Sequence, residues 1–219
     1  MSTNFNTAPQ PGTPPTQPAM TMANDQQTFV MNAFRGQPYL VDQLDVQDEP
    51  LYDTLTFNAG DTITVNTAQW FTSVGPQSNK SLVQTNLTET RHLVAPEAFS
   101  VFGIRLVPNE NILGPDWENI LQGFIFQFWF NSKAFNTAQI RHYAAGMGTY
   151  AVTTRTAESW YTNGFPSLTS GHLLALPLVI TNLLSFFAQL FGNNYTLNSG
   201  GTGLVFICEL VGLHARAVM

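Results

Sequence analysis

The clearest hydrophobic pattern of the chain lies within residues 120–148. In the first half of this stretch, apolar side chains recur at every second position, which predicts a β-strand because successive strand side chains point to opposite faces. The positions of one parity are all phenylalanine: Phe124, Phe126, Phe128 and Phe130. The other parity is also mostly apolar, so we expect the strand to be covered on both faces, inside a sandwich or at a contact between subunits. The second half, residues 133–143, predicts another strand that ends at a glycine-rich exit.

A hairpin is predicted around residue 60. Leu55 and Phe57 alternate with polar residues before the segment 58–61, Asn-Ala-Gly-Asp, and Ile63 and Val65 alternate after it. Asn, Gly and Asp are residues that tight turns favour, and alternation on both sides of a turn is typical of paired strands. We therefore expect the two flanking strands to pair with each other.

Several other segments are predicted to be strands joined by loops. The strands cover residues 82–94, 98–107, 150–152 and 204–219. The last of them is long and apolar, so we expect it to be buried in a sheet. Loops are expected at residues 69–77 and 108–117, where Gly, Pro and Asn are frequent. The predicted fold class is all-β.

Residues 173–191 form an apolar run that is about long enough to span the hydrocarbon core of a bilayer. Pro177, Thr181 and Asn182 interrupt the run, and no Lys or Arg flanks it to set an orientation. Two strands, residues 173–180 and 183–191, fit the pattern better than a membrane span. A strand followed by a short helix, capped by Thr181, fits equally well, because the second segment also has a helical apolar face.

The N-terminal segment has the composition of an extended arm. Residues 1–28 are rich in Pro, Thr, Gln and Asn and cannot bury enough surface to offset the entropy of ordering. Apolar side chains follow, including Phe29, Phe34 and Tyr39, and we expect them to clasp a surface. We therefore divide the chain into an arm, residues 1–40, and a sandwich domain, residues 41–219. Without a charged n-region or an apolar h-region, no signal peptide is predicted, and we expect synthesis and assembly in a cytoplasm.

The composition favours association with other protein chains. Of the 219 residues, 44% are hydrophobic and only 10% are charged, against roughly 25% in typical soluble domains. With 17 Phe and so few charges, the surface is expected to carry apolar patches that meet other subunits. The net charge of −6 and the scattered Lys and Arg residues argue against direct binding to nucleic acid. The lone Cys208 is expected to be a small buried core residue.

No motif in the sequence nominates a catalytic, cofactor-binding or metal-binding residue. The four histidines are far apart, no Gly-x-Ser-x-Gly motif occurs, and the loop 200–203 lacks the Lys of a phosphate-binding loop. Five acidic residues lie within positions 42–53, but their spacing does not match a calcium-binding EF-hand. We interpret them as a solvated acidic loop. The chain is therefore not expected to be an enzyme.

Two segments and the overall organisation carry a family resemblance. These are Phe-Ser-Val-Phe-Gly-Ile-Arg-Leu-Val-Pro at 99–108 and Glu-Leu-Val-Gly-Leu-His-Ala-Arg at 209–216, together with the Pro-rich arm and eight or nine predicted strands. In these features the chain resembles the jelly-roll capsid proteins of icosahedral bacteriophages, notably the membrane-containing ones related to the tectivirus and adenovirus lineage. The resemblance implies a single eight-stranded jelly-roll β-sandwich with an extended N-terminal arm.

The same resemblance implies a function in the virion. The chain would assemble with itself or with other capsid proteins, its arm strapping neighbouring subunits, over an internal lipid membrane in membrane-containing particles. The residues expected at such contacts are Phe29, Phe34, Tyr39, Phe124, Phe126, Phe128 and Phe130. A second hypothesis is a glycan-binding module for host attachment. Its expected aromatic platforms are Trp70, Trp117, Trp160 and Tyr161, which lie in predicted loops.

Overall fold

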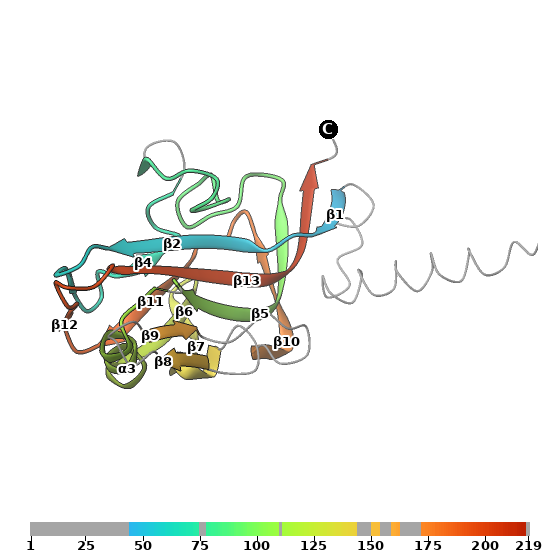
Figure 1. Cartoon of the computed structure of the whole chain (residues 1–219). Coiled ribbons are helices and arrows are strands. Elements are labelled where there is room, and N and C mark those ends of the chain that lie inside the picture. The colour runs from blue at the N-terminus through green and yellow to red at the C-terminus, as the bar shows by residue number, and fades with distance from the viewer. Residues whose placement is uncertain are drawn as a thin grey trace, which may run out of the picture.

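The computed structural model describes residues 44–74, 78–109, 111–143, 150–153, 159–162 and 172–217, and within them the chain is mainly β-sheet (Figure 1). The all-β prediction is confirmed. The strands are β1 (Leu44–Asp48), β2 (Leu51–Phe57), β3 (Thr62–Ile63), β4 (Gln69–Trp70), β5 (Ala98–Pro108), β6 (Phe124–Phe130), β7 (Lys133–Gln139), β8 (Tyr150–Thr153), β9 (Ser159–Thr162), β10 (His172–Thr181), β11 (Phe186–Gly192), β12 (Tyr195–Thr196) and β13 (Leu204–Ala217). An α-helix, α3 (Gly114–Gly123), and a 3₁₀-helix, η2 (Ile140–Tyr143), accompany them.

Two antiparallel sheets contain most of the strands. In the first sheet the order is β1–β13–β5–β10, and β2 also pairs with β13. Figure 1 shows β2 and β13 running side by side, with β1 near the far end of β13. Strands β1 and β2 share one edge of β13, because β1 pairs with residues 213–217 and β2 with residues 204–210. In the second sheet the order is β4–β11–β6–β7.

The pairings of eight of these strands are nested. Taken in chain order, the first of the eight, β2, pairs with the last, β13; β4 pairs with β11, β5 with β10, and β6 with β7. The eight strands therefore form one long folded-back hairpin. Two lateral pairings, β13 with β5 and β11 with β6, join the four pairs into the two sheets.

The two sheets face each other across a common core. Trp70 on β4 lies edge-on to Phe206 on β13, with 5.2 Å between ring centroids, and its indole nitrogen donates a hydrogen bond of 2.9 Å to the Phe206 carbonyl. The α3 side chain Trp117 packs against the same phenylalanine at 5.7 Å. Both tryptophans are fully buried. Cys208 is also fully buried, as the sequence predicted.

Several local predictions were wrong. Residues 114–117, predicted as part of a loop, belong to α3. Residues 120–123 belong to α3 and not to the aromatic strand, which begins at Phe124. The turn at 58–61 does form, with the Asp61 amide donating to the Asn58 carbonyl, but the strands on either side of it do not pair: β2 pairs with β13, and β3 with β12. The segment 82–94 makes turns and isolated bridges in place of the predicted strand.

The apolar run at 173–191 consists of the strands β10 and β11, joined by a short turn. The prediction of two strands is confirmed, and the alternative of a helix over the second segment is wrong. Among the described residues, no helix is both long and apolar enough to span a bilayer. Residues 159–162, expected to lie in a surface loop, form strand β9, which pairs with β8.

Candidate functional site

The outer face of the second sheet carries a row of uncharged polar side chains across all four strands. Gln69 on β4 lies opposite Gln189 on β11, which lies opposite Gln127 on β6, which lies opposite Thr137 on β7. Neighbouring positions of opposite parity are buried in the core: Trp70, Ala188, Leu190, Phe126 and Phe128. The row therefore points away from the first sheet, because strand side chains alternate between faces.

Hydrogen bonds join this row into a directed chain. Arg91 Nη2 donates to Gln69 Oε1 at 3.1 Å, and Gln69 Nε2 donates to Gln189 Oε1 at 3.2 Å. Gln189 Nε2 then donates to Gln127 Oε1 at 2.8 Å. Gln69 and Gln189 each accept on one side and donate on the other, so the chain runs from a guanidinium cation to the amide oxygen of Gln127.

An aromatic pair lies beside the row. The rings of Trp129 and Phe187 are parallel within 5°, with 5.8 Å between centroids, and the two residues are cross-strand neighbours. The Trp129 indole donates to Gln127 Oε1 at 3.4 Å, and the Arg91 guanidinium lies 4.6 Å from the centre of the Phe187 ring. We call the six sheet residues Gln69, Gln127, Gln189, Thr137, Trp129 and Phe187 the amide face. None of these six side chains titrates near neutral pH.

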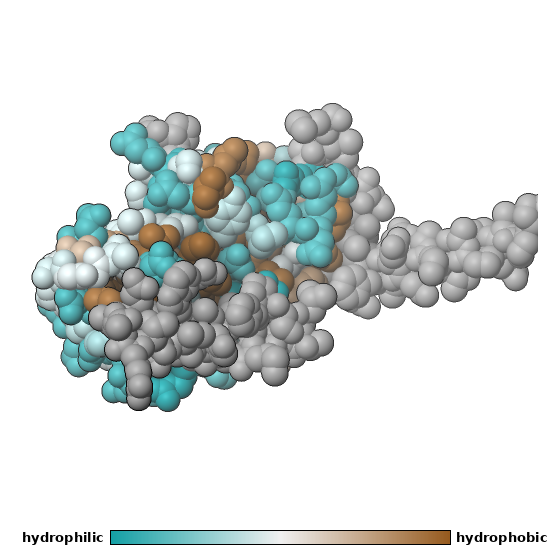
Figure 2. All heavy atoms as spheres, viewed as in Figure 1, coloured by the Kyte–Doolittle hydropathy of each residue, from teal (hydrophilic) through white to brown (hydrophobic). Residues whose placement is uncertain are grey.

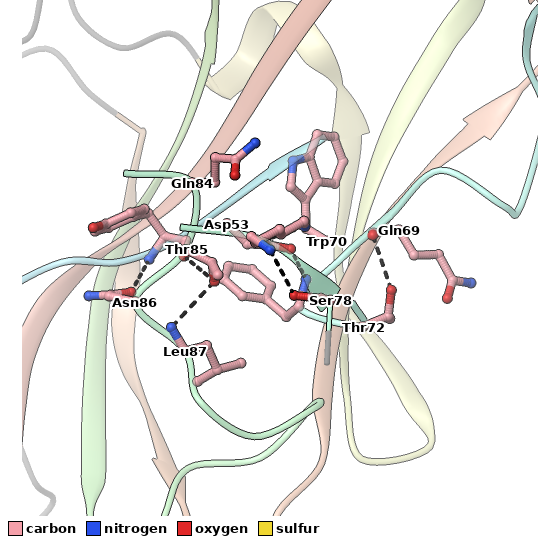
Figure 3. A network of polar contacts seen from close by, with 12 residues as sticks. Asp53, Gln69, Trp70, Thr72, Ser78, Gln84, Thr85, Asn86 and Leu87 are labelled. Carbon is pink, nitrogen blue, oxygen red and sulfur yellow. Dashed lines mark hydrogen bonds and ion pairs between the residues drawn. The ribbon is translucent and has the colours of Figure 1, made fainter. Parts of the chain in front are cut away.

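A second polar network is built around a buried carboxylate (Figure 3). The side chain of Asp53 is fully buried. It accepts a hydrogen bond of 2.6 Å from the Phe71 amide and forms an ion pair of 2.7 Å with Lys80 Nζ. Burial raises the pKa of Asp53, against the opposing effects of Lys80 and the Phe71 amide. Nearby, the Tyr52 amide donates to Asn86 Oδ1 at 2.9 Å. The network therefore fastens the β4–β5 loop onto β2.

A shallow pocket of about 190 Å³ lies in the β4–β5 connection. Its lining residues are mostly small and hydroxyl-bearing: Thr72, Ser73, Val74, Ser78 and Thr90. None of these lining side chains is titratable at ordinary pH, so they supply no general acid or base.

Two histidines, His142 on η2 and His172 at the start of β10, approach each other. The rings of His142 and His172 are 4.3 Å apart, and Asn136 Nδ2 lies 3.2 Å from His172 Nε2. The same asparagine accepts a hydrogen bond of 2.9 Å from the Tyr143 hydroxyl through Oδ1. Burial, and then the neighbouring His142, lowers the pKa of His172. The cluster therefore links β7 to β10 through a neutral imidazole.

A third histidine, His214 on β13, lies between two carboxylates. Its Nε2 is 3.4 Å from Glu97 and its Nδ1 is 3.8 Å from Glu49, which also contacts Arg216. Burial lowers the pKa of His214, and Glu97 opposes this effect. Within the described residues, no three His, Cys, Asp or Glu side chains gather closely enough to hold a metal ion.

The residues predicted for subunit contacts do not form one surface. Phe124, Phe126 and Phe128 are buried in the core of the chain itself, because their parity of β6 faces the first sheet. Their assignment to an interface is therefore wrong. Phe130 is partly buried and packs against the same core. The remaining three, Phe29, Phe34 and Tyr39, lie outside the described residues.

The aromatic residues predicted for glycan binding also do not form an exposed surface within the described residues. Trp70 and Trp117 are fully buried, so neither can serve as an exposed platform. The side chains of Trp160 and Tyr161 lie outside the described part of the structure. Sequence reasoning missed the amide face, although Gln127 and Trp129 occupy the parity of the aromatic strand opposite to the phenylalanines.

Large apolar side chains are exposed elsewhere on the molecule. Figure 2 shows hydrophobic residues, in brown, reaching the surface among hydrophilic ones. The most exposed are in loops, turns and a bulged part of β10: Leu82, Val83, Leu173, Leu176 and Leu183. Leu183 in the β10–β11 turn is 84% exposed to solvent, and Leu176 is 72% exposed.

Comparisons of this chain with protein-family models, with curated protein sequences and with solved structures find no match. What the chain does must therefore be inferred from its own geometry.

Proposed function

We propose that the chain is a structural subunit of a viral capsid, folded as a single eight-stranded jelly roll. The observation that carries this proposal is the nested strand pairing. Numbered one to eight in chain order, the strands of the first sheet follow the order 1-8-3-6 and those of the second the order 2-7-4-5. This order arises when a hairpin of eight strands rolls up, and jelly rolls of this kind are frequent in capsid proteins.

Fold alone does not assign function, so the surface matters as well. Exposed leucines such as Leu82, Leu176 and Leu183 are costly in a monomer and favourable at a contact, where each buried leucine contributes roughly 1.5–3 kcal/mol. Repetition around a closed symmetry multiplies such contacts. With 10% charged residues, the chain has few ion pairs to offer, and apolar contacts are the expected source of cohesion.

The described cations support a role without nucleic-acid binding. Lys80 pairs with Asp53, Arg105 with Glu209, and Arg216 contacts Glu49. These three are paired with carboxylates, and the other described cations, Arg91, Lys133 and Arg141, belong to three different segments of the chain. Phosphate backbones require clustered free cations. In the capsid we expect copies of this chain, other coat proteins and, in a membrane-containing particle, the lipid beneath the shell as partners. The arm, residues 1–40, would strap neighbouring subunits.

The test is the association state of the purified chain. Light scattering across a concentration series, followed by negative-stain microscopy, is expected to reveal discrete capsomers or shells. The double substitution Leu176→Ser and Leu183→Ser should weaken association without unfolding the domain, since both side chains are exposed. The matched control Asn193→Ser, at an exposed polar position, should assemble normally.

Removal of residues 1–28 tests the contribution of the arm to assembly separately from that of the domain. The truncated chain should keep its β-sheet circular dichroism but fail to close shells. Normal shells from the truncated chain would contradict the strapping role. A chain that stays monomeric at every concentration, with the arm intact, would contradict self-assembly.

A further inference from the structure

The hydrogen-bond chain of the amide face ends at an open donor. Gln127 Oε1 accepts from both Gln189 and Trp129, which fixes the orientation of the Gln127 amide. Its Nε2 makes no hydrogen bond to any described residue, and the side chain is half-buried at the sheet surface. Because the chain begins at the cation Arg91 and each bond polarises the next, this terminal N–H group is a strengthened donor. It therefore favours an acceptor oxygen from outside the chain.

An aromatic surface lies next to that donor. The Trp129 ring is held in place by its stacking on Phe187 and by its own hydrogen bond to Gln127. The faces of aromatic rings carry partial negative charge and attract weakly positive C–H groups. A ligand that combines hydroxyl oxygens with an apolar C–H face can contact Gln127 and Trp129 together. Pyranose sugars have both features.

The charge of the face restricts the ligand further. None of its six residues is ionisable at neutral pH, and the adjacent Arg91 is already engaged by Gln69 and the Phe187 ring. A cationic ligand would lose hydration without gaining a counter-charge, and the six residues themselves offer no counter-charge to an anion. A neutral polyol loses less on binding. The open donor of Gln127 and the exposed residue Thr137 can both form hydrogen bonds with hydroxyl groups, whereas Gln189 between the strands is buried.

The size of the face fits several sugar units. Four neighbouring strands, about 4.8 Å apart, give the polar row a length of about 14 Å. The next outward-facing residues on either side are about 6.6 Å away along the strands. On one side these are Trp129 and Phe187, and on the other Ile125 and Phe191. On the two central strands the polar row thus lies between two apolar borders, which suits an extended chain of rings.

We propose that the amide face binds a neutral oligosaccharide, with Gln127 and Trp129 at the centre of the site. This site is distinct from the aromatic loop positions expected from the sequence. It also does not depend on the capsid assignment, since a sugar site and an assembly surface can occupy separate parts of one subunit.

Isothermal titration of the full chain tests the proposal. The probes are maltohexaose, laminarihexaose, cellohexaose, mannohexaose and chitohexaose, with oligogalacturonate as the anionic comparison. At least one neutral probe should bind, and oligogalacturonate should bind at least ten-fold more weakly. Gln127→Leu removes the donor at similar volume, and Trp129→Ala removes the platform; each should lower the affinity at least ten-fold. The control Asn193→Ser should bind like the unaltered chain.

Three results would overturn the proposal: no binding by any neutral probe, tighter binding of the anionic probe, or binding that survives both substitutions. Trp129→Phe guards against a folding artefact, because it keeps a ring and should retain part of the affinity. Light scattering of the same variants tests whether a second copy of the chain, and not a sugar, occupies the amide face. If Gln127→Leu and Trp129→Ala change the association state, the amide face is a contact between copies of the chain and not a sugar site.

Discussion

Lys80 Nζ lies 2.7 Å from Asp53 Oδ1, and this pair joins the loop after β4 to a fully buried carboxylate on β2. The Lys80 side chain is itself only 15% exposed. A buried ion pair gains little over an apolar replacement, because both ions lose their hydration. The pair matters because each ion compensates the other: a single buried charge left without its partner would strongly destabilise the fold.

Removal of one partner should therefore cost more than removal of both. Lys80→Met strands the Asp53 carboxylate and should lower the free energy of unfolding by roughly 3 kcal/mol. The double variant Lys80→Met with Asp53→Asn should recover most of that loss. Urea unfolding measures both, with Lys133→Met on the exposed strand β7 as the control. Equal losses in the single and double variants would mean that the pair does not act as a unit.

The two fully buried tryptophans should respond differently to loss of their indole nitrogen. Trp70 Nε1 donates to the Phe206 carbonyl, whereas Trp117 Nε1 is buried without a hydrogen-bond partner among the described residues. Trp70→Phe leaves a carbonyl short of a donor, while Trp117→Phe removes an unsatisfied group. We expect Trp70→Phe to cost about 1–3 kcal/mol more than Trp117→Phe.

Thermal unfolding of the two variants, followed by circular dichroism, measures this difference. Both substitutions remove a similar volume from the same core, so the cavity contribution largely cancels in the comparison. A larger loss of stability for Trp117→Phe than for Trp70→Phe would contradict a stabilising role of the Trp70–Phe206 hydrogen bond between the sheets.

The sequence predicted those elements whose pattern is local. The alternation at Phe124–Phe130 identified β6, and the long apolar terminus identified β13, because each pattern depends only on near neighbours. The choice of partner strand, by contrast, does not depend on near neighbours. Strand β2 pairs with β13, about 150 residues later in the chain, and no turn signal near residue 60 indicates this. The local turn signal instead suggested a hairpin with β3.

Long-range contacts also explain the missed site residues. Asp53 belongs to a cluster of acids that the composition favours as solvated, yet Lys80 and Phe71 make its burial possible from a distant loop. The amide face needs Gln69, Gln127 and Gln189 in one register across three strands. Each glutamine alone is an ordinary polar residue. Only the strand order aligns them.

Gly212 should be intolerant of any side chain. It follows the register shift between β13 and β5, and a Cβ atom there would lie 1.9 Å from the Ser100 carbonyl oxygen. Relief requires movement of the central strands, so Gly212→Ala should cost about 3 kcal/mol, the upper end for overpacking. Gly123→Ala is the control, because a Cβ at the end of α3 would meet no atom within 4 Å. Similar stability of the two variants in urea would contradict this close packing.

Acidification should weaken the link between β7 and β10. In the neutral form His172 Nε2 accepts from Asn136 Nδ2, and protonation replaces that acceptor by a second donor. The pKa of His172 is lowered in the folded chain by burial and by His142. In the pH range just below 6.5, the unfolded histidine therefore binds a proton that the folded one does not. Stability must then rise with pH through this range and be lost on acidification.

One histidine can contribute a slope of at most about 1.4 kcal/mol per pH unit. The variant His172→Gln retains an acceptor for Asn136 but does not titrate, so the dependence of its unfolding free energy on pH between 6.5 and 5.5 should be shallower. Asn193→Ser, at an exposed polar position that does not titrate, is the control and should keep the original slope. All other titratable groups are the same in the three proteins, so their effects cancel in the comparison. If the slope of His172→Gln equals that of the unaltered chain, His172 binds protons equally in the folded and unfolded states, and the contact with Asn136 does not favour its neutral form.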